Sequence, residues 1–358
     1  MMVRVLTFLD KVSMGETADI YTALTDEAIE LAKHVELHVL TRYVSPAFKA
    51  PCESKFIIHR IKVEDPLIGL KTYLKYIKSL FKLYGLVDVV YLRTMGDHEV
   101  ISFNLLQRLG LKSVIRLMGT SWFEYGDLKS RILRGLYRDS IRRADRVILF
   151  STHMTRLVQK FAGISPHKIV YIENPINTRF FTFNYQEGIR VREKLGLGLN
   201  PVVLSVSVIA PRKGVHKLVE AFKYVKEKIP QAHLVHIGPS ASIHKQYFSE
   251  IRKLVDRLGL KSSVHFLGPI PNRELRSYYS AARINGVFVL ASVSSEGVPK
   301  VMLEAMSVGV PTVAPKIGGI PDVIKDGVNG YIVEPSSNPK LIAEKIVKVL
   351  VEDKRHDM

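Results

Sequence analysis

Short runs of β-branched residues alternate with longer amphipathic stretches along almost the whole chain. This alternation is typical of α/β proteins in which helices cover a mostly parallel sheet, because strands buried on both faces are apolar at nearly every position. In residues 1–175 it predicts strands at 3–9, 37–41, 87–92, 113–117, 146–150 and around 169–172, with helices at 20–34, 66–84, 98–109, 128–143 and 152–162.

A second cycle begins after residues 176–200, which have no clear period. Its predicted strands are 202–206, 232–237, 264–267, 286–291, 311–314 and 330–333, and its predicted helices are 214–228, 243–258, 272–282, 299–308, 320–324 and 339–352. Since 358 residues exceed the usual limit of a single core, we expect two Rossmann-like doubly wound domains. They span 1–175 and 201–340, with a linker at 176–200 and a C-terminal helix at 341–358. Two such domains that face each other enclose a central cleft, where ligands bind.

The chain is strongly basic, with 52 Lys and Arg against 34 Asp and Glu and a formal net charge of +18. Such a charge favours polyanionic partners, which include nucleotides, nucleic acids and anionic lipid surfaces. The sequence carries no nucleic-acid recognition motif, so we expect no nucleic-acid partner.

Cys52 is the single cysteine, which excludes an internal disulfide and a cysteine metal cluster. No acidic pair or His cluster has metal-ligand spacing, and no apolar run approaches the roughly 18 residues of a membrane span. The apolar start at 3–9 is cut off by Asp10 and Lys11, too early for a secretory signal. We therefore expect a protein without a metal site in a cytoplasmic setting.

Two glutamates stand on either side of the start of predicted helix 299–308. Glu296 directly follows a predicted strand, and Glu304 lies about five residues into the helix, roughly 7.5 Å along its axis. Pro299 fits the first helical turn, where its missing N–H costs nothing. The two carboxylates can accept hydrogen bonds from two sets of hydroxyls, and the helix amides between them favour a phosphate. A solvated acid and a helix cap would show the same spacing.

A longer pattern surrounds these glutamates. It reads Ser-Glu-Gly-x-Pro-x4-Glu-Ala-Met-x2-Gly-x-Pro-x-Val-Ala from Ser295, then Gly-Gly-Ile-Pro-Asp from Gly318 and Asp-Gly-x-Asn-Gly from Asp326. The pattern closely resembles the retaining glycosyltransferases of family 4 (glycosyltransferase group 1), which have the GT-B fold. The resemblance implies that Glu296 contacts the transferred sugar and Glu304 the ribose of a nucleotide sugar. It also implies donor binding by the residues between them, which are Gly297, Val298, Pro299, Lys300 and Val301.

The basic turn at 211–215 lies between a predicted strand and a predicted helix. A lysine at a helix N-terminus suits a diphosphate, because its ammonium lies beside backbone amides that lack carbonyl partners. An ordinary basic turn is the alternative. The resemblance implies that Lys213 binds the donor diphosphate and stabilises the departing nucleoside diphosphate without a metal. Relatives usually carry an arginine five or six positions earlier, where this chain has Val208 and Ser207. Either Arg212 substitutes for it, or the phosphate is held less tightly.

Gly268 and Ile270 follow predicted strand 264–267 and match the stretch that lies against the nucleobase in the family, although a plain turn fits equally well. The match is looser in the N-terminal half. Relatives often carry a His after the strand that corresponds to 113–117, and this chain has Met-Gly-Thr there. The acceptor-side candidates are Gly15, Gly119 and Thr120, although both glycines could equally be turn glycines.

Residues 70–84 form two helical stripes. One carries Lys71, Lys75, Lys78 and Lys82, and the other carries Leu70, Tyr73, Leu74, Ile77, Leu80 and Tyr84. Two interpretations remain, a helix that docks on an anionic membrane or a surface helix with solvated lysines. The arginines at 131, 134, 138, 142 and 143 favour the membrane.

The sequence therefore predicts a retaining, hexose-transferring enzyme that takes a UDP-, GDP- or ADP-linked sugar, needs no cofactor and acts on a saccharide or lipid-linked acceptor. The expected location is the cytoplasm or the inner face of the membrane. A sugar-nucleotide epimerase of the same fold and a non-catalytic sugar-nucleotide-binding homologue are the alternatives. Relatives usually continue past 351–353 with a helical tail, so we expect the chain to be a truncated form with looser domain coupling.

Overall fold

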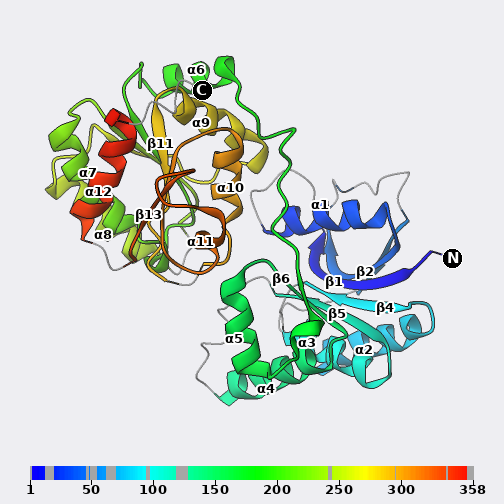
Figure 1. Ribbon diagram of the computed structural model, residues 1–358. Helices are drawn as coiled ribbons and strands as arrows, with labels where there is room; N and C mark the ends of the chain where they lie inside the picture. Colours follow the sequence, from blue (N-terminus) through cyan, green and yellow to red (C-terminus); the bar gives the residue numbers. More distant parts are fainter. Residues whose placement is uncertain are drawn as a thin grey trace. The chain divides into compact units, whose positions relative to one another are not determined.

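The computed structural model describes residues 2–12, 20–45, 48, 55–61, 70–93, 97–117, 128–240, 244–294, 296–335 and 338–352. The chain divides into two compact units, Met1–Glu173 (unit 1) and Asn174–Met358 (unit 2), which are drawn in Figure 1. Each unit is a parallel α/β layer structure, as the alternation of the sequence predicts.

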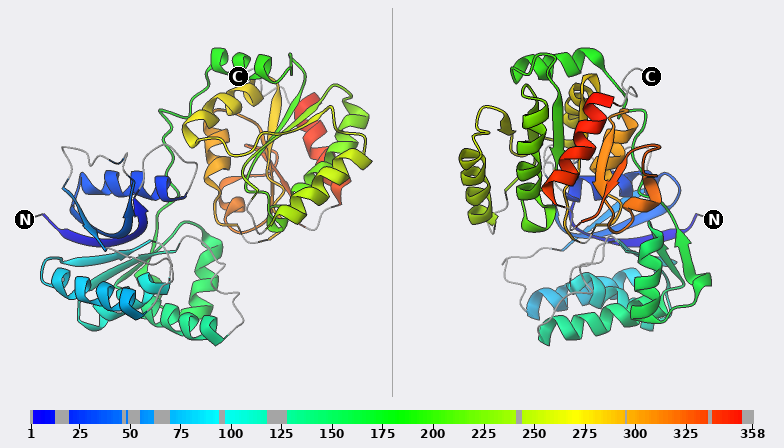
Figure 2. Two further views of the ribbon diagram at one scale, coloured as in Figure 1. Left: turned by 180° about the vertical axis from the view of Figure 1, so that it is seen from behind. Right: turned by 60° about the vertical axis from the view of Figure 1, so that its left-hand side comes forward.

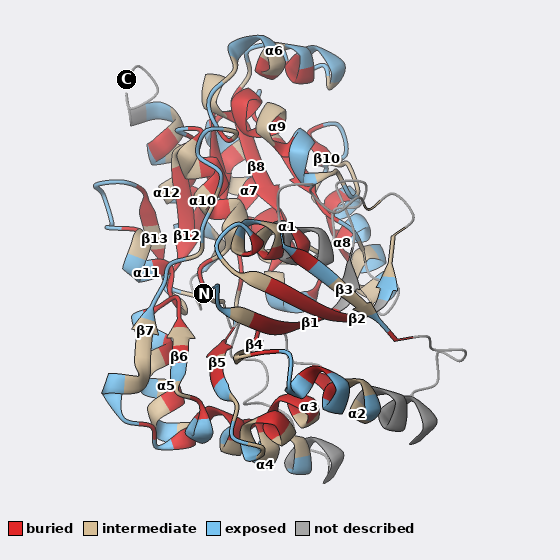
Figure 3. Ribbon diagram, turned by 90° about the vertical axis from the view of Figure 1, so that its right-hand side faces the viewer, coloured by how far each residue is buried: buried red, intermediate tan, exposed pale blue. Residues whose placement is uncertain are grey.

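Unit 1 contains a seven-stranded sheet in the order β3-β2-β1-β4-β5-β6-β7. Its strands are β1 (Arg4–Val12), β2 (Glu36–Val44), β3 (Phe56–Arg60), β4 (Val89–Leu92), β5 (Lys112–Arg116), β6 (Arg146–Leu149) and β7 (Ile169–Tyr171). All neighbouring strands run parallel. The central strands are buried, as Figure 3 shows for β1 and β2, because helices cover the sheet.

The helices of unit 1 lie on both faces of its sheet (Figure 1). They are α1 (Ile20–Ala32), α2 (Leu70–Tyr84), α3 (Asp97–Arg108), α4 (Leu128–Arg143) and α5 (Thr152–Ala162). Helices α2, α3, α4 and α5 pack against one another in sequence order, and α1 packs on β1 and β2. The helices divide between the two faces because crossovers between parallel strands are right-handed. From the centre of the sheet the chain adds strands first toward β3 and later, in the opposite direction, toward β7.

Unit 2 contains a six-stranded parallel sheet in the order β10-β9-β8-β11-β12-β13. Its strands are β8 (Val202–Val206), β9 (His233–Ile237), β10 (Val264–Phe266), β11 (Gly286–Val289), β12 (Thr312–Pro315) and β13 (Tyr331–Val333). Every residue of β8 and β11 is buried. These two strands form the centre of the sheet.

The helices of unit 2 form two layers, which the two views of Figure 2 show on opposite faces of the sheet. The helices are α6 (Tyr185–Lys194), α7 (Val215–Lys228), α8 (Lys245–Arg257), α9 (Asn272–Ile284), α10 (Lys300–Ser307), α11 (Ile320–Val323) and α12 (Pro339–Val347). Helix α7 packs against α8 and α12, whereas α9 packs against α6 and α10. The core cluster of unit 2 includes Phe222, Leu234 and Ile342, and it lies under the α7 layer.

Two elements differ from the sequence-based expectation. Strand β3 was not predicted, although its first three residues are apolar. It is a short edge strand of its sheet, and only Phe56 on it is buried. Helix α6 lies within 176–200, where we expected a linker. It contains Gly188, which weakens helix propensity. A Cβ at Gly188 would lie 2.9 Å from the backbone of Ser280 on α9, so the glycine permits close packing of α6 on that helix.

Arg192 anchors α6 to unit 2 through a buried guanidinium that is 1% exposed. It donates hydrogen bonds to the backbone carbonyls of Gly198 at 2.8 Å and Ala281 at 2.5 Å, and to that of Asn200. Burial lowers the pKa of this guanidinium. One side chain therefore donates to carbonyls of two separate segments, the turn at 198–200 and helix α9, and its loss would remove a donor from each of them.

We expect Arg192→Met to lower the free energy of unfolding of unit 2 by about 3 kcal/mol, because carbonyls around a buried guanidinium lose their hydrogen-bond donor. Urea unfolding followed by circular dichroism measures this change. Arg190→Met, on the exposed side of the same helix, is the control and is expected to change stability by less than about 0.5 kcal/mol. Equal effects of the two substitutions would contradict this account.

Candidate functional site

Two loops of unit 2 emerge side by side where the order of strands reverses. Strand β8 leads through the 3₁₀ turn Pro211–Lys213 into α7, and β11 leads through the loop that holds Glu296 into α10. Because β8 and β11 are parallel neighbours, both loops lie at the same C-terminal edge of the sheet. Ligands of doubly wound sheets bind at this type of position. The fold thus brings Lys213 to Glu296 across 83 positions of sequence.

Three side chains converge on the Glu296 carboxylate. Lys213 Nζ donates a hydrogen bond to Glu296 Oε1 in a close ion pair, and the Ser292 hydroxyl donates to the same oxygen at 2.6 Å. Arg212 Nη1 lies 3.9 Å from it. The backbone N–H of Val293 donates to the Arg212 carbonyl at 2.9 Å, which ties the two loops together. Ser292 is a contact that the sequence analysis missed.

The Lys213–Glu296 pair is largely shielded from water, with side chains that are 13% and 8% exposed. Burial lowers the pKa of the Lys213 ammonium, and the attraction of Glu296 opposes that shift. Removal of either partner would leave a buried charge without compensation. Arg212 is half-exposed, so it adds positive charge at the edge of the pair rather than within it.

The loop around Glu296 is supported from two distant parts of the sequence. Gly318 has φ of 55°, and a Cβ there would lie 1.6 Å from the Glu296 carbonyl oxygen. The next residue, Gly319, donates its N–H to the Gly297 carbonyl at 3.0 Å. Asn174 Nδ2 donates to the Val298 carbonyl at 2.8 Å. The Gly-Gly turn and Asn174 therefore fix the backbone on which the site depends.

Glu304 lies in a different environment, on α10, and its residue is 4% exposed. Asn272 Nδ2 donates to Glu304 Oε1 at 3.0 Å, and the Tyr279 hydroxyl donates to Oε2 at 2.9 Å. Burial raises the pKa of this carboxyl, and the two hydrogen bonds oppose the shift. Asn272 and Tyr279 belong to α9 and were missed by the sequence analysis.

The remaining candidates of unit 2 lie around the same edge. Pro299 is the N-cap of α10, and Lys300 and Val301 form its first turn, where helix amides lack carbonyl partners within the helix. Gly268 and Ile270 follow β10, and the Gly268 carbonyl accepts the N–H of Gly238, which follows β9.

Three candidates of unit 1, Gly15, Gly119 and Thr120, lie outside the described residues. Within the described part of the chain, no group of three or more His, Cys, Asp and Glu side chains is arranged to hold a metal ion. Independence from a metal stays a prediction.

Comparison with known families identifies the chain. Its two units have the two Rossmann-like domains of the GT-B fold. Residues 190–358 match the family model described as glycosyl transferases group 1, and residues 22–180 match that of glycosyltransferase family 4. The two matches together cover most of the chain, which therefore belongs to the group 1 glycosyltransferases of family 4.

Among curated proteins, the chain is similar to a GDP-mannose-dependent α-(1-6)-phosphatidylinositol monomannoside mannosyltransferase of Mycolicibacterium smegmatis. The two are 28% identical over 260 residues, which cover 68% of this chain and 65% of that protein. It is also similar to spore coat protein SA of Bacillus subtilis, with 32% identity over 48% of this chain and 46% of that protein. The matched part thus spans less than two thirds of each relative.

Two solved structures show the same fold. Anabaena HepE, in complex with UDP and glucose, superposes with a TM-score of 0.76 at 19% identity over 99% of this chain and 91% of HepE. The sucrose-phosphate synthase of Thermosynechococcus elongatus superposes with a TM-score of 0.78 at 20% identity, also over 99% of this chain and 91% of that protein.

We expect Gly318→Ala to lower the free energy of unfolding by at least about 2 kcal/mol. The new Cβ would displace the Glu296 backbone, and the alanine would have to adopt a left-handed backbone conformation. Gly327→Ala is the matched control. It also has positive φ, at 76°, but no atom lies within 4 Å of its Cβ position, so it is expected to cost only about 1 kcal/mol. Denaturant unfolding of both variants decides the matter, and similar losses would mean that contact with Glu296 is unimportant.

Proposed function

We propose that this protein is a retaining glycosyltransferase that moves a hexose from a nucleoside diphosphate sugar to an acceptor, with the donor bound by unit 2. The observation that carries the proposal is the Lys213–Glu296 pair at the point where the strand order of unit 2 reverses. A cation and a carboxylate are there held together beside the first turn of α10. This combination suits a diphosphate next to a sugar.

The pair suggests how the donor enters the site. In the free protein Lys213 neutralises Glu296, so neither buried charge is left alone. Among the described residues, the polar contacts of this carboxylate are all made to Oε1, which leaves Oε2 for a sugar hydroxyl. A bound diphosphate would attract Lys213, Arg212 and the amides of Lys300 and Val301. Glu296 would then be released to accept hydrogen bonds from the sugar.

We further propose that transfer retains the configuration of the sugar and needs no metal. The bond between C1 and the diphosphate oxygen breaks, the bond between C1 and the acceptor oxygen forms, and a diphosphate oxygen takes the acceptor proton. Fixed positive groups stabilise the negative charge that develops on the departing diphosphate. Lys213 would take this role in our proposal, because burial strengthens its electrostatic interactions.

The donor base and the acceptor are proposed as classes. One relative is named for GDP-mannose and a phosphatidylinositol mannoside, and HepE was solved with UDP and glucose. We therefore propose a UDP-, GDP- or ADP-linked hexose as the donor and a saccharide or lipid-linked acceptor. A thermal-shift panel of the three classes of sugar nucleotide would identify the donor, because a bound ligand raises the melting temperature.

With the donor identified, we expect Glu296→Gln to lower kcat/KM by about 10²–10³-fold, because Glu296 is proposed to contact the sugar. The Kd of the bare nucleoside diphosphate should change by less than about threefold.

Lys213→Met is expected to weaken binding of the bare nucleoside diphosphate by at least about tenfold, because a charge-assisted hydrogen bond is lost. Product analysis and calorimetry measure the two effects.

Glu274→Gln, an exposed change on α9, is the control for both variants. Two outcomes would overturn the proposal. An isomerised sugar nucleotide formed without acceptor would identify an epimerase, and donor binding without turnover on a broad acceptor panel would identify a non-catalytic homologue.

We also propose that unit 1 docks on an anionic membrane through α2 and α4. On α2, Leu80 and Leu83 are buried, whereas Phe81 is 57% exposed between the exposed Lys78 and Lys82. An exposed aromatic ring between two cations is typical of helices at a membrane surface. The side chains of the first half of α2, Lys71 and Lys75 included, lie outside the described residues. No helix in the described ranges combines the length and apolar character needed to cross a bilayer.

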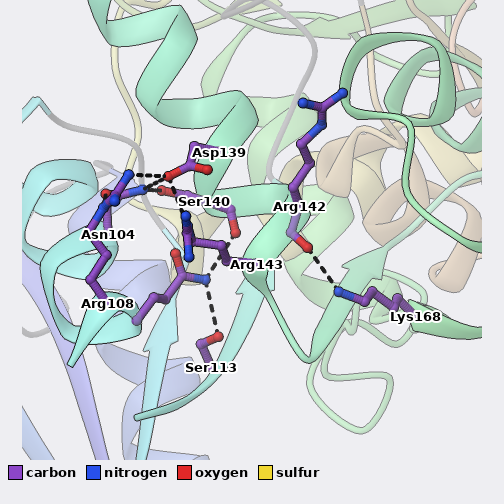
Figure 4. Close-up of polar contacts among 9 residues, drawn as sticks. Asn104, Arg108, Ser113, Asp139, Ser140, Arg142, Arg143 and Lys168 are labelled. Atoms are coloured by element: carbon purple, nitrogen blue, oxygen red, sulfur yellow. Dashed lines mark hydrogen bonds and ion pairs between the residues drawn. The ribbon is translucent and has the colours of Figure 1, made fainter. Parts of the chain in front are cut away.

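Helix α4, which packs against α3 on the same face of the sheet as α2, adds further positive charge to unit 1. Ile132 on it is 62% exposed, and Arg134 and Arg138 are exposed as well. Figure 4 shows that Asp139 partly offsets two further arginines, because it pairs with Arg108 at 2.8 Å and with Arg143 at 3.0 Å. The cations that favour a lipid surface are therefore those of α2 and the first turns of α4.

We expect the double variant K78E/K82E to reduce binding to vesicles with 30% phosphatidylglycerol by at least about tenfold, because each lysine near an anionic surface contributes about 1 kcal/mol. Co-sedimentation at low and high salt measures this, and high salt should abolish the difference. The variant K253E/K261E places the same charge change on exposed positions of unit 2 and is the control. Equal losses in both variants would contradict docking through α2.

A further inference from the structure

Glu304 is held by two residues of one face of α9. Asn272 and Tyr279 stand seven positions apart, which is two helical turns, so both side chains can reach the same neighbour. Asn272 donates to Oε1 and Tyr279 to Oε2, at 3.0 and 2.9 Å. Each carboxylate oxygen keeps a further lone pair for a ligand. The arrangement fixes the plane of the carboxylate.

The Tyr279 side chain is fully buried, and its hydroxyl donates to Glu304. Its ring packs in edge-to-face arrangement against Phe181 at 6.1 Å and Phe288 at 6.0 Å between ring centroids. Burial, together with the nearby Glu304 charge, raises the pKa of the Tyr279 hydroxyl well above its usual value. The hydroxyl therefore stays protonated and remains a hydrogen-bond donor. Packing alone would be served as well by phenylalanine.

The charge on Glu304 depends on these donors. Burial raises the pKa of its carboxyl, while the hydrogen bonds from Asn272 and Tyr279 and the positive charge of Lys300 lower it. Asn272 and Tyr279 come from α9, and Lys300 lies one turn before Glu304 on α10. Without the two donors, this buried carboxyl would bind a proton more readily. A protonated carboxyl would be a poorer acceptor for sugar hydroxyls.

We propose that Tyr279 and Asn272 are positioning residues that keep Glu304 oriented and ionised, so that it can accept hydrogen bonds from the ribose of the donor nucleotide. This inference rests on the proposed function, because it takes Glu304 as the group that contacts the ribose. It extends that function to α9 through the contacts of Asn272 and Tyr279 with Glu304. Recognition of the nucleoside then depends on a network that spans two helices.

The test compares Tyr279→Phe with Tyr278→Phe, its neighbour on α9, which is also buried. We expect Tyr279→Phe to raise the donor KM by about tenfold with kcat within about twofold, because one hydrogen bond to a charged group is lost. The Kd of the bare nucleoside diphosphate should rise by the same factor, since the ribose is present in both ligands. Tyr278→Phe should leave both constants unchanged.

Two further measurements separate positioning from a merely structural role. The acid limb of the pH profile of kcat/KM should move to higher pH by about one unit in Tyr279→Phe, because Glu304 then binds its proton more readily. In a Glu304→Ala background, Tyr279→Phe should have no further effect on nucleotide affinity. Melting temperatures of all variants show that each one is folded.

The outcomes distinguish this inference from the proposed function. If the wild-type protein binds no sugar nucleotide, the proposed function fails. If the wild-type protein binds one, but Tyr279→Phe matches Tyr278→Phe in affinity and pH profile, the positioning role is wrong. A full effect of Tyr279→Phe in the Glu304→Ala background would likewise overturn it, because the tyrosine would then act by another route.

Discussion

The parallel pairing of β8 with β11 is the constraint on which the candidate site depends. It places the turn that ends at Lys213 next to the loop that holds Glu296, although an α-β-α-β-α-β segment separates them in sequence. The ion pair that results neutralises two largely buried charges. Since an isolated charge would be costly there, the pair keeps both loops in place.

Other parts of unit 2 support this pair through the backbone rather than through charge. The Gly-Gly turn before α11 lies directly against the carbonyl of Glu296, and Asn174 holds the carbonyl of Val298. Helix α9 stabilises the second carboxylate, Glu304, through Asn272 and Tyr279. Three segments far apart in sequence thus support one loop and one helix, and the candidate site depends on much of unit 2.

Much of the fold could be predicted from the sequence. The strands β8 and β11 are apolar at nearly every position, so their burial follows directly from composition. Strand β3 and helix α6 could not be found in this way. The first is an edge strand with one buried residue, and the second has a glycine within it and depends on close packing against α9. Local pattern is weak wherever a neighbouring element supplies the stability.

The sequence by itself determined the class of fold, the family and the residue types of the site, because alternating apolar runs and a long motif need no knowledge of contacts. Only the tertiary structure decided that Lys213 pairs with Glu296, that Ser292 and Asn174 support the same loop, and that Tyr279 reaches Glu304. These are contacts between residues 4 to 124 positions apart. The order of strands and the packing of helices decide which of these residues come into contact, and the local sequence pattern does not contain that information.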